Sequence, residues 1–142
     1  MMISTKGRYA LRVMIDLAEH SGGGYMPLRD VAERQQISEK YLESIIVILS
    51  KAGYLDGLRG KGGGYRLTRA ASDYTVGSIL RLTEGDLAPV ACLGGDEMKC
   101  ERAASCRTLP MWKKFYEITN EYFDSITLAD LMVQGDGGDY VI

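Results

Sequence analysis

The cysteines of the chain, Cys92, Cys100 and Cys106, fall within one window of fifteen residues, and no cysteine lies elsewhere. Glycine and charged residues fill the rest of the window, which predicts a loop rather than part of an apolar core. Thiolates that converge in a loop can bind zinc or an iron–sulfur cluster, or act as a redox switch. Structural cysteines would be expected among apolar side chains. The window therefore indicates a metal or redox site.

The composition predicts that this site belongs to an ordinary soluble protein. The chain has 142 residues, of which 46% are hydrophobic and 25% charged, as expected for one compact domain with an appendage. No apolar run is long enough to span a membrane, and the first residues lack the apolar centre of a signal peptide. We therefore expect a cytoplasmic protein with no membrane partner. Thiols stay reduced there, which favours metal binding or redox chemistry over disulfides.

The charge is distributed unevenly along the chain, although the net charge is only −2. Residues 1–70 contain eleven Lys and Arg against seven Asp and Glu, a balance of +4. Residues 71–142 contain six against twelve, a balance of −6. If the protein binds a polyanion, the first half is the part expected to meet it, although an uneven but functionless surface has the same pattern.

The first half of the chain is predicted to form three helices. The first begins at Ser4 or Thr5 and runs to about His20, and the second runs from Leu28 to about Gln35. The third covers about residues 39–52 and is capped by Ser38. Its apolar residues recur at steps of three and four, which predicts one buried face: Leu42, Ile45, Ile46, Leu49 and Ala52. The short turn between the last two helices is typical of a helix-turn-helix unit, and a plain helical hairpin in a core is the alternative.

In a helix-turn-helix unit the second helix enters the major groove of DNA with its N-terminal residues toward the bases. We therefore expect Ser38, Tyr41 and Ser44 to contact bases. Lys40 and Lys51 are expected to contact phosphates. Glu43 lies on the same helix, where it could repel phosphate, discriminate between sites or simply be solvated.

The glycine run Gly60–Gly64 lies between two short segments with strand-like sequence, residues 54–59 and 65–67. Glycines permit the positive φ angles of a tight turn, so the segment predicts a β-hairpin with Arg59 and Lys61 at its tip. An arginine beside glycines can enter a narrow minor groove. A linker would not be bracketed by alternating apolar residues, and the Walker and dinucleotide phosphate-loop patterns fail at Gly62 and Tyr65.

The second half predicts a helix over about residues 75–83, then the cysteine loop, then a helix after Pro110. Mostly apolar and aromatic residues of the last helix recur at steps of three and four: Trp112, Phe115, Thr119, Tyr122 and Ile126. This spacing favours packing on a partner helix, with packing on its own domain as the alternative. The predicted organisation is a DNA-binding domain (1–83), a cluster-binding loop (84–109), a dimerisation helix with a short helix (110–133) and a flexible tail (134–142).

Three segments carry a family resemblance: STKGRYALR at residues 4–12, ISEKYLE at 37–43 and RGKGGGY at 59–65. They resemble the IscR/NsrR/CymR family of bacterial winged-helix repressors, over nearly the whole chain from Ile3 to about Val133. The resemblance implies a mainly α-helical fold with a small β-hairpin wing and a long C-terminal dimerisation helix. It also implies a homodimer that binds double-stranded promoter DNA. In family members of the IscR kind, three such cysteines hold a 2Fe–2S cluster.

The fourth ligand of such a cluster is not evident in this sequence. The family pattern has a histidine at the position of Leu109, or an aspartate at that of Arg8, and neither residue can bind iron. The only histidine is His20, for which a surface position is the simpler interpretation. Solvent, an exogenous thiol and four side chains are open candidates: Asp96, Glu97, Glu101 and Thr108. Zinc fits the cysteine spacing poorly. Two other functions are alternatives: a cluster-free thiol regulator that acts with a protein partner and, more remotely, a thiol enzyme.

Overall fold

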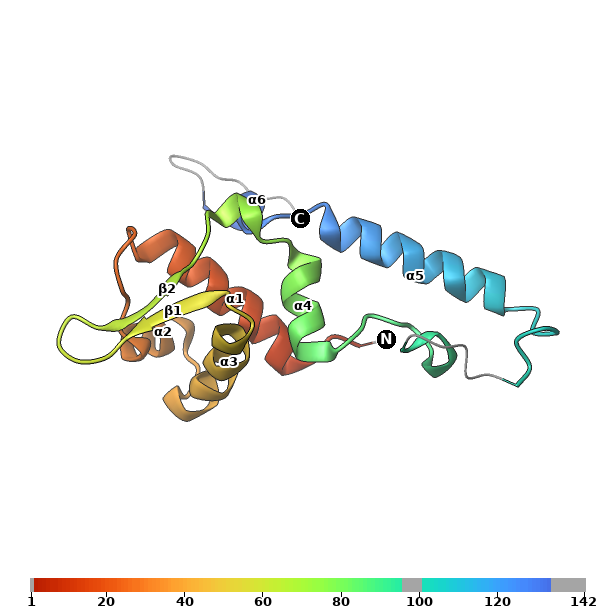
Figure 1. The fold of residues 1–142 in the computed structure, drawn as a ribbon, viewed down its shortest axis with the longest axis horizontal. Coiled ribbons are helices and arrows are strands. Elements are labelled where there is room, and N and C mark those ends of the chain that lie inside the picture. Colours follow the sequence, from red (N-terminus) through yellow and green to blue (C-terminus); the bar gives the residue numbers. More distant parts are fainter. Residues whose placement is uncertain (1, 96–100, 134–142) are drawn as a thin grey trace.

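The computed structural model describes residues 2–95 and 101–133. These form a mainly helical molecule with one two-stranded sheet, which confirms the predicted fold class (Figure 1). Cys100, Asp96, Glu97 and the predicted tail 134–142 lie outside the described residues. The helices are α1 (Thr5–His20), α2 (Leu28–Gln35), α3 (Glu39–Lys51), α4 (Val76–Glu84), α5 (Leu109–Asp124) and α6 (Leu128–Leu131). The strands are β1 (Leu55–Leu58) and β2 (Gly64–Leu67), and two short 3₁₀ turns are η1 (Ala71–Asp73) and η2 (Ala91–Leu93).

Helix α1 is the central element of the core, and α2, α3, α4, α6 and β2 all pack against it. Its buried side chains include Val13, Met14 and Leu17, which are at most 1% exposed. Ser4 begins the helix by accepting a hydrogen bond from the Gly7 amide at 3.0 Å. The Ser4 hydroxyl and amide also donate to Glu84, at 2.6 and 2.9 Å. The start of α1 is therefore fixed to the end of α4, from which the chain continues toward the cysteine window.

The turn between α2 and α3 has the geometry of a helix-turn-helix unit. Gln36 ends α2 in the left-handed conformation with φ of 55°, and Ile37 is buried next to it. The Ser38 hydroxyl oxygen then accepts a hydrogen bond from the Tyr41 amide at 3.1 Å, so the predicted N-cap is confirmed. Four of the five residues of the predicted apolar face of α3 are buried, which fixes the rotation of the helix about its axis: Leu42, Ile45, Ile46 and Leu49. The fifth, Ala52, is half-buried and caps the helix just beyond its end.

Strands β1 and β2 pair antiparallel and form the predicted hairpin. Two residues of the glycine run must be glycine because the backbone of another segment approaches them closely. A Cβ atom on Gly63 would lie 2.1 Å from the carbonyl oxygen of Leu58. Gly64 has φ of 145°, and a Cβ atom there would lie 2.1 Å from the carbonyl oxygen of Met26. The glycine run is therefore a structural requirement of the hairpin rather than a linker.

Helix α5 packs on α4 and extends away from the rest of the molecule (Figure 1). Arg81 of α4 joins the two helices by donating to both carboxylate oxygens of Asp124, at 2.8 and 2.9 Å. None of the helices in the described parts of the chain is long and apolar enough to span a bilayer.

The predicted contact stripe of α5 is partly wrong. Thr119 is only 9% exposed, because the side of α5 that carries it faces α4. Ile126, also predicted for the stripe, lies beyond the end of α5 and packs against the core of its own protomer. The large apolar side chains that stay exposed are instead Met111 (53%), Phe115 (44%), Ile118 (52%) and Tyr122 (59%). Their steps of four, three and four residues still give one continuous stripe, rotated from the predicted one.

Candidate DNA interface and thiol site

The exposed side of α3 carries the residues that could reach DNA. Lys40, Ser44 and Lys51 are exposed, and Glu43 and Val47 lie on the same side. Because the opposite side of α3 is buried in the core, these residues form the only face of α3 that could enter a groove. The exposed face excludes a plain hairpin inside a core, since both sides of such a helix would be covered.

Three predicted base-contacting residues are partly engaged within the protein itself. The Ser38 oxygen already accepts from the Tyr41 amide, and the Ser44 hydroxyl donates to the Tyr41 carbonyl oxygen at 2.6 Å. The Tyr41 ring is half-buried and meets the Tyr9 ring edge to face, with centroids 5.8 Å apart. These contacts hold the N-terminal turn of α3 in place. The second lone pair of each serine oxygen and the phenol group of Tyr41 can still form hydrogen bonds with DNA.

A groove of about 420 Å³ lies between the N-terminal turns of α1 and α3. The Arg12 guanidinium stands 4.9 Å from the centre of the Tyr9 ring beside it. The lining of the groove combines aromatic rings with hydroxyl groups: Thr5, Tyr9, Gln36, Ile37, Ser38 and Tyr41. The contribution of α1 to this groove was not predicted from the sequence.

Arg59 and Lys61 are exposed at the tip of the hairpin, as expected for a wing. The hairpin follows α3 directly, and its loop projects beyond the helices (Figure 1). Arg66, farther back, is engaged within the protein, since it pairs with Asp56 at 3.3 Å and stacks on the Tyr25 ring at 4.4 Å. The tip therefore presents two exposed basic side chains beyond the helices.

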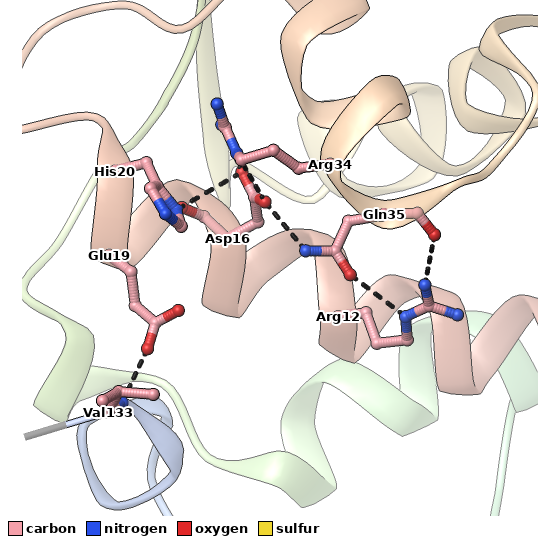
Figure 2. A network of polar contacts seen from close by, with 7 residues as sticks. All are labelled: Arg12, Asp16, Glu19, His20, Arg34, Gln35 and Val133. Carbon is pink, nitrogen blue, oxygen red and sulfur yellow. Dashed lines mark hydrogen bonds and ion pairs between the residues drawn. The ribbon is translucent and has the colours of Figure 1, made fainter. Parts of the chain in front are cut away.

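A polar network joins α1 to the end of α2 and was also missed by the sequence analysis (Figure 2). Its centre is Asp16, a residue only 1% exposed. Arg34 donates two hydrogen bonds to its carboxylate, at 2.7 and 3.0 Å, and Gln35 donates a third at 2.8 Å. Arg12 in turn donates to the side chain and the carbonyl oxygen of Gln35. The sequence did contain a signal for this network: an acidic residue lies within the apolar face of the first predicted helix. A buried carboxylate requires a hydrogen-bonding or charged partner.

Burial raises the pKa of Asp16, but its hydrogen bonds from Arg34 and Gln35 and the charges of Arg34 and His20 lower it more. The net pKa lies below the ordinary value of 3.8. Asp16 is thus a stable carboxylate that fixes the end of α2, and through it the turn that leads into α3.

The described thiols, Cys92 and Cys106, are free and lie at the two ends of the cysteine window. Cys92 lies in η2, and Cys106 comes three residues before α5, with its sulfur 3.4 Å from the Thr108 hydroxyl. The hydroxyl of Thr108 and the amides of Thr108 and Leu109 lower the pKa of the Cys106 thiol. The lowered pKa favours the thiolate, which is the form that binds metals and reacts with oxidants.

His20 belongs to the Asp16 network rather than to the thiol window. Its Nδ1 lies 3.0 Å from the Asp16 carbonyl oxygen (Figure 2). Moreover, His20 ends α1, whereas the end of α4 that leads to the thiol window is fixed to the start of the same helix. These two ends of α1 are about 22 Å apart. Among the residues that the structure describes, no group of three or more His, Cys, Asp or Glu residues could hold a metal ion. The side chain of Leu109 has no atom that can bind a metal, and the guanidinium of Arg8 is a cation that donates to Thr5, so neither can be a ligand.

A helix-turn-helix unit followed by a hairpin with a basic tip defines a winged-helix DNA-binding protein. The chain belongs to the Rrf2 family of transcriptional regulators, whose profile, described as an iron-dependent transcriptional regulator, matches residues 3–134.

Relatives and solved structures point to two branches of this kind of regulator. The transcriptional regulator IscR of Vibrio atlanticus is 38% identical over 132 residues, which cover 93% of this chain and 75% of the relative. The structure of IscR from T. potens superposes with a TM-score of 0.75 at 37% identity, covering 100% of this chain and 93% of that one. The structure of CymR, the global cysteine regulator of B. subtilis, has a TM-score of 0.77 at 36% identity, with coverage of 96% and 99%. These relatives are named as regulators and not as enzymes, so the thiol-enzyme alternative is not supported.

Proposed function

We propose that this protein is a homodimeric cytoplasmic repressor whose affinity for promoter DNA depends on a 2Fe–2S cluster held by Cys92, Cys100 and Cys106. The observation that carries the proposal is the position of the thiol window, between the winged-helix domain and the exposed apolar stripe of α5. Gain or loss of the cluster in this window would change the spacing of the two recognition helices of the dimer. The protein would thereby shift between a conformation that can bind promoter DNA and one that cannot.

The donor set suits an iron–sulfur cluster. Cys92 and Cys106 are free thiols outside the two apolar cores, and hydrogen bonds from Thr108 lower the pKa of Cys106. Thiolates are the usual ligands of such clusters, which supply reversible one-electron chemistry when bound. Thr108 lies within contact of Cys106 and remains a candidate fourth ligand together with Glu101, Asp96, Glu97, solvent or an exogenous thiol.

Protein purified without oxygen is expected to be coloured, with visible absorption and equal amounts of iron and acid-labile sulfide. A variant with Cys92, Cys100 and Cys106 changed to alanine should be colourless but keep the same helix content by circular dichroism. A colourless wild-type protein that stays free of iron after reconstitution would overturn the cluster proposal. The proposal that the protein binds DNA would not be affected by that result.

The same three residues could serve a cluster-free thiol regulator that acts with a protein partner. The lowered pKa of Cys106 and the similarity to CymR favour this second function. One solved CymR structure, from Staphylococcus aureus, is of an oxidized form, with a TM-score of 0.72 at 34% identity over 96% of this chain and 100% of that one. If metal-free protein binds its promoter and loses affinity after mild oxidation only when Cys106 is present, this alternative replaces the cluster.

The proposal places α3 in the major groove, with Ser38, Tyr41 and Ser44 toward the bases and Lys40 and Lys51 toward phosphates. It places Arg59 and Lys61 of the wing on the minor groove. The Arg59→Ala variant is expected to weaken promoter binding by about 10- to 100-fold and to relax the sequence preference under the wing. Lys61→Ala should weaken binding to all DNA sequences alike. It should also reduce the slope of log Kd against log salt concentration by about one, because one phosphate contact is lost.

Fluorescence anisotropy of labelled promoter DNA over a range of salt concentrations measures both effects. Lys113→Ala is the matched control, since Lys113 is also exposed but lies on α5. If Arg59→Ala binds as tightly as the wild type while Lys113→Ala behaves normally, the assignment of the wing is wrong.

The exposed stripe of α5 supports a homodimer. Four large apolar side chains at coiled-coil spacing are a costly surface for a monomer and a suitable contact for a second copy of the same helix. A twofold dimer also matches the symmetry of operators bound by helix-turn-helix proteins.

A further inference from the structure

Val47 differs from its neighbours on the exposed face of α3. It is 49% exposed and belongs to neither apolar core, whereas the surrounding exposed residues are polar or charged: Lys40, Glu43, Ser44 and Lys51. Within α3, which lies wholly in the described part of the chain, it is the only large hydrophobic residue that is exposed. Its side chain is therefore not placed there by packing in the protomer.

Helix stability does not explain Val47 either. A β-branched residue lowers helix propensity by about 0.5 kcal/mol relative to alanine, because its χ1 rotation is restricted. Polar residues with higher propensity would suit an exposed position better if the position had no other use. A binding partner with an apolar group at this point would explain the residue.

The position of Val47 suggests what that partner group is. Val47 follows Ser44 by three residues and precedes Lys51 by four, so the three side chains lie in one row on the helix face. Ser44 is proposed to face bases and Lys51 to face a phosphate, which puts Val47 between them inside the groove. In the major groove, the one apolar group among the base edges is the 5-methyl group of thymine.

We propose that Val47 contacts the 5-methyl group of a thymine in the operator and gives this protein a preference for thymine at that base pair. The inference rests on the proposed placement of α3 in the major groove. The contact is short-range and rigid, because the valine side chain has one rotatable bond and is carried by a helix fixed in the core.

The test begins with the full-length protein, purified without oxygen, and operators selected from random duplexes. Each thymine of the selected operator is then replaced in turn by deoxyuridine, which removes only the methyl group. Kd is measured for the wild type, Val47→Ala and Val47→Thr. At one thymine of a half-site, replacement should weaken wild-type binding about fourfold, as expected for one buried methyl group. Val47→Ala should bind both duplexes equally, and Val47→Thr, which keeps one methyl group, should show an intermediate loss.

Because Val47 is half-exposed, Val47→Ala should fold normally, and a thermal melt of each variant checks this. If every deoxyuridine replacement has the same effect on the wild type and on Val47→Ala, Val47 does not contact a thymine methyl group and the inference is wrong. If the wild type selects no preferred sequence, the proposed function fails, and the inference fails with it. The two failures are thus distinguished by the selection step.

Discussion

Replacing Ile118 by aspartate is expected to separate the proposed dimer into monomers. Ile118 is 52% exposed in the protomer and lies in the middle of the apolar stripe of α5. In a twofold dimer the substitution acts on both copies, and each copy loses the burial of an isoleucine side chain and gains a carboxylate that must lose water. The expected cost is about 4 kcal/mol, or roughly a thousandfold in the dimer dissociation constant.

Sedimentation velocity over a range of protein concentrations measures this change directly. Lys113→Asp is the matched control, because it places the same residue on an exposed position of α5 away from the stripe. Promoter binding should weaken together with dimerisation in Ile118→Asp and stay unchanged in the control. A dimer of wild-type affinity in Ile118→Asp would show that another surface joins the protomers.

Replacing Asp16 by asparagine is expected to lower the free energy of unfolding by about 3 kcal/mol. The carboxylate is fully buried and accepts three hydrogen bonds from Arg34 and Gln35. Asparagine keeps the size of the side chain but loses the charge, and its amide group presents N–H donors to the donors of Arg34. Chemical denaturation followed by circular dichroism measures the loss. Asp56→Asn is the control, since the Asp56–Arg66 pair is exposed and should contribute less than about 1 kcal/mol.

The effect of Asp16 also has a predictable pH dependence. Its pKa in the folded state lies below the ordinary value of 3.8, so folding favours the charged form. The stabilisation is therefore present above that value and is lost as the pH falls through the folded pKa. The difference in stability between the wild type and Asp16→Asn should be constant near neutral pH and shrink below about pH 4. A difference that does not change with pH would show that the charge of Asp16 is not the stabilising feature.

The sequence by itself was sufficient for features that depend on neighbouring residues. The apolar period of α3, its Ser38 cap and the glycines of the wing predicted the helix-turn-helix unit and the hairpin. These signals are local, because an α-helix repeats every 3.6 residues and a tight turn is restricted by its own φ angles. The cysteine window was likewise visible from spacing alone.

Only the tertiary structure decided which side of each helix is covered and which distant residues meet. Packing on α4 turned Thr119 inward and left Ile118 exposed, although both fit the same period within α5. Asp16 found its partners 18 and 19 positions later in the chain, and the same network took up His20. Helix periodicity shows that one face is apolar, but the rotation of a helix against its neighbours is set by contacts between residues that are far apart in sequence.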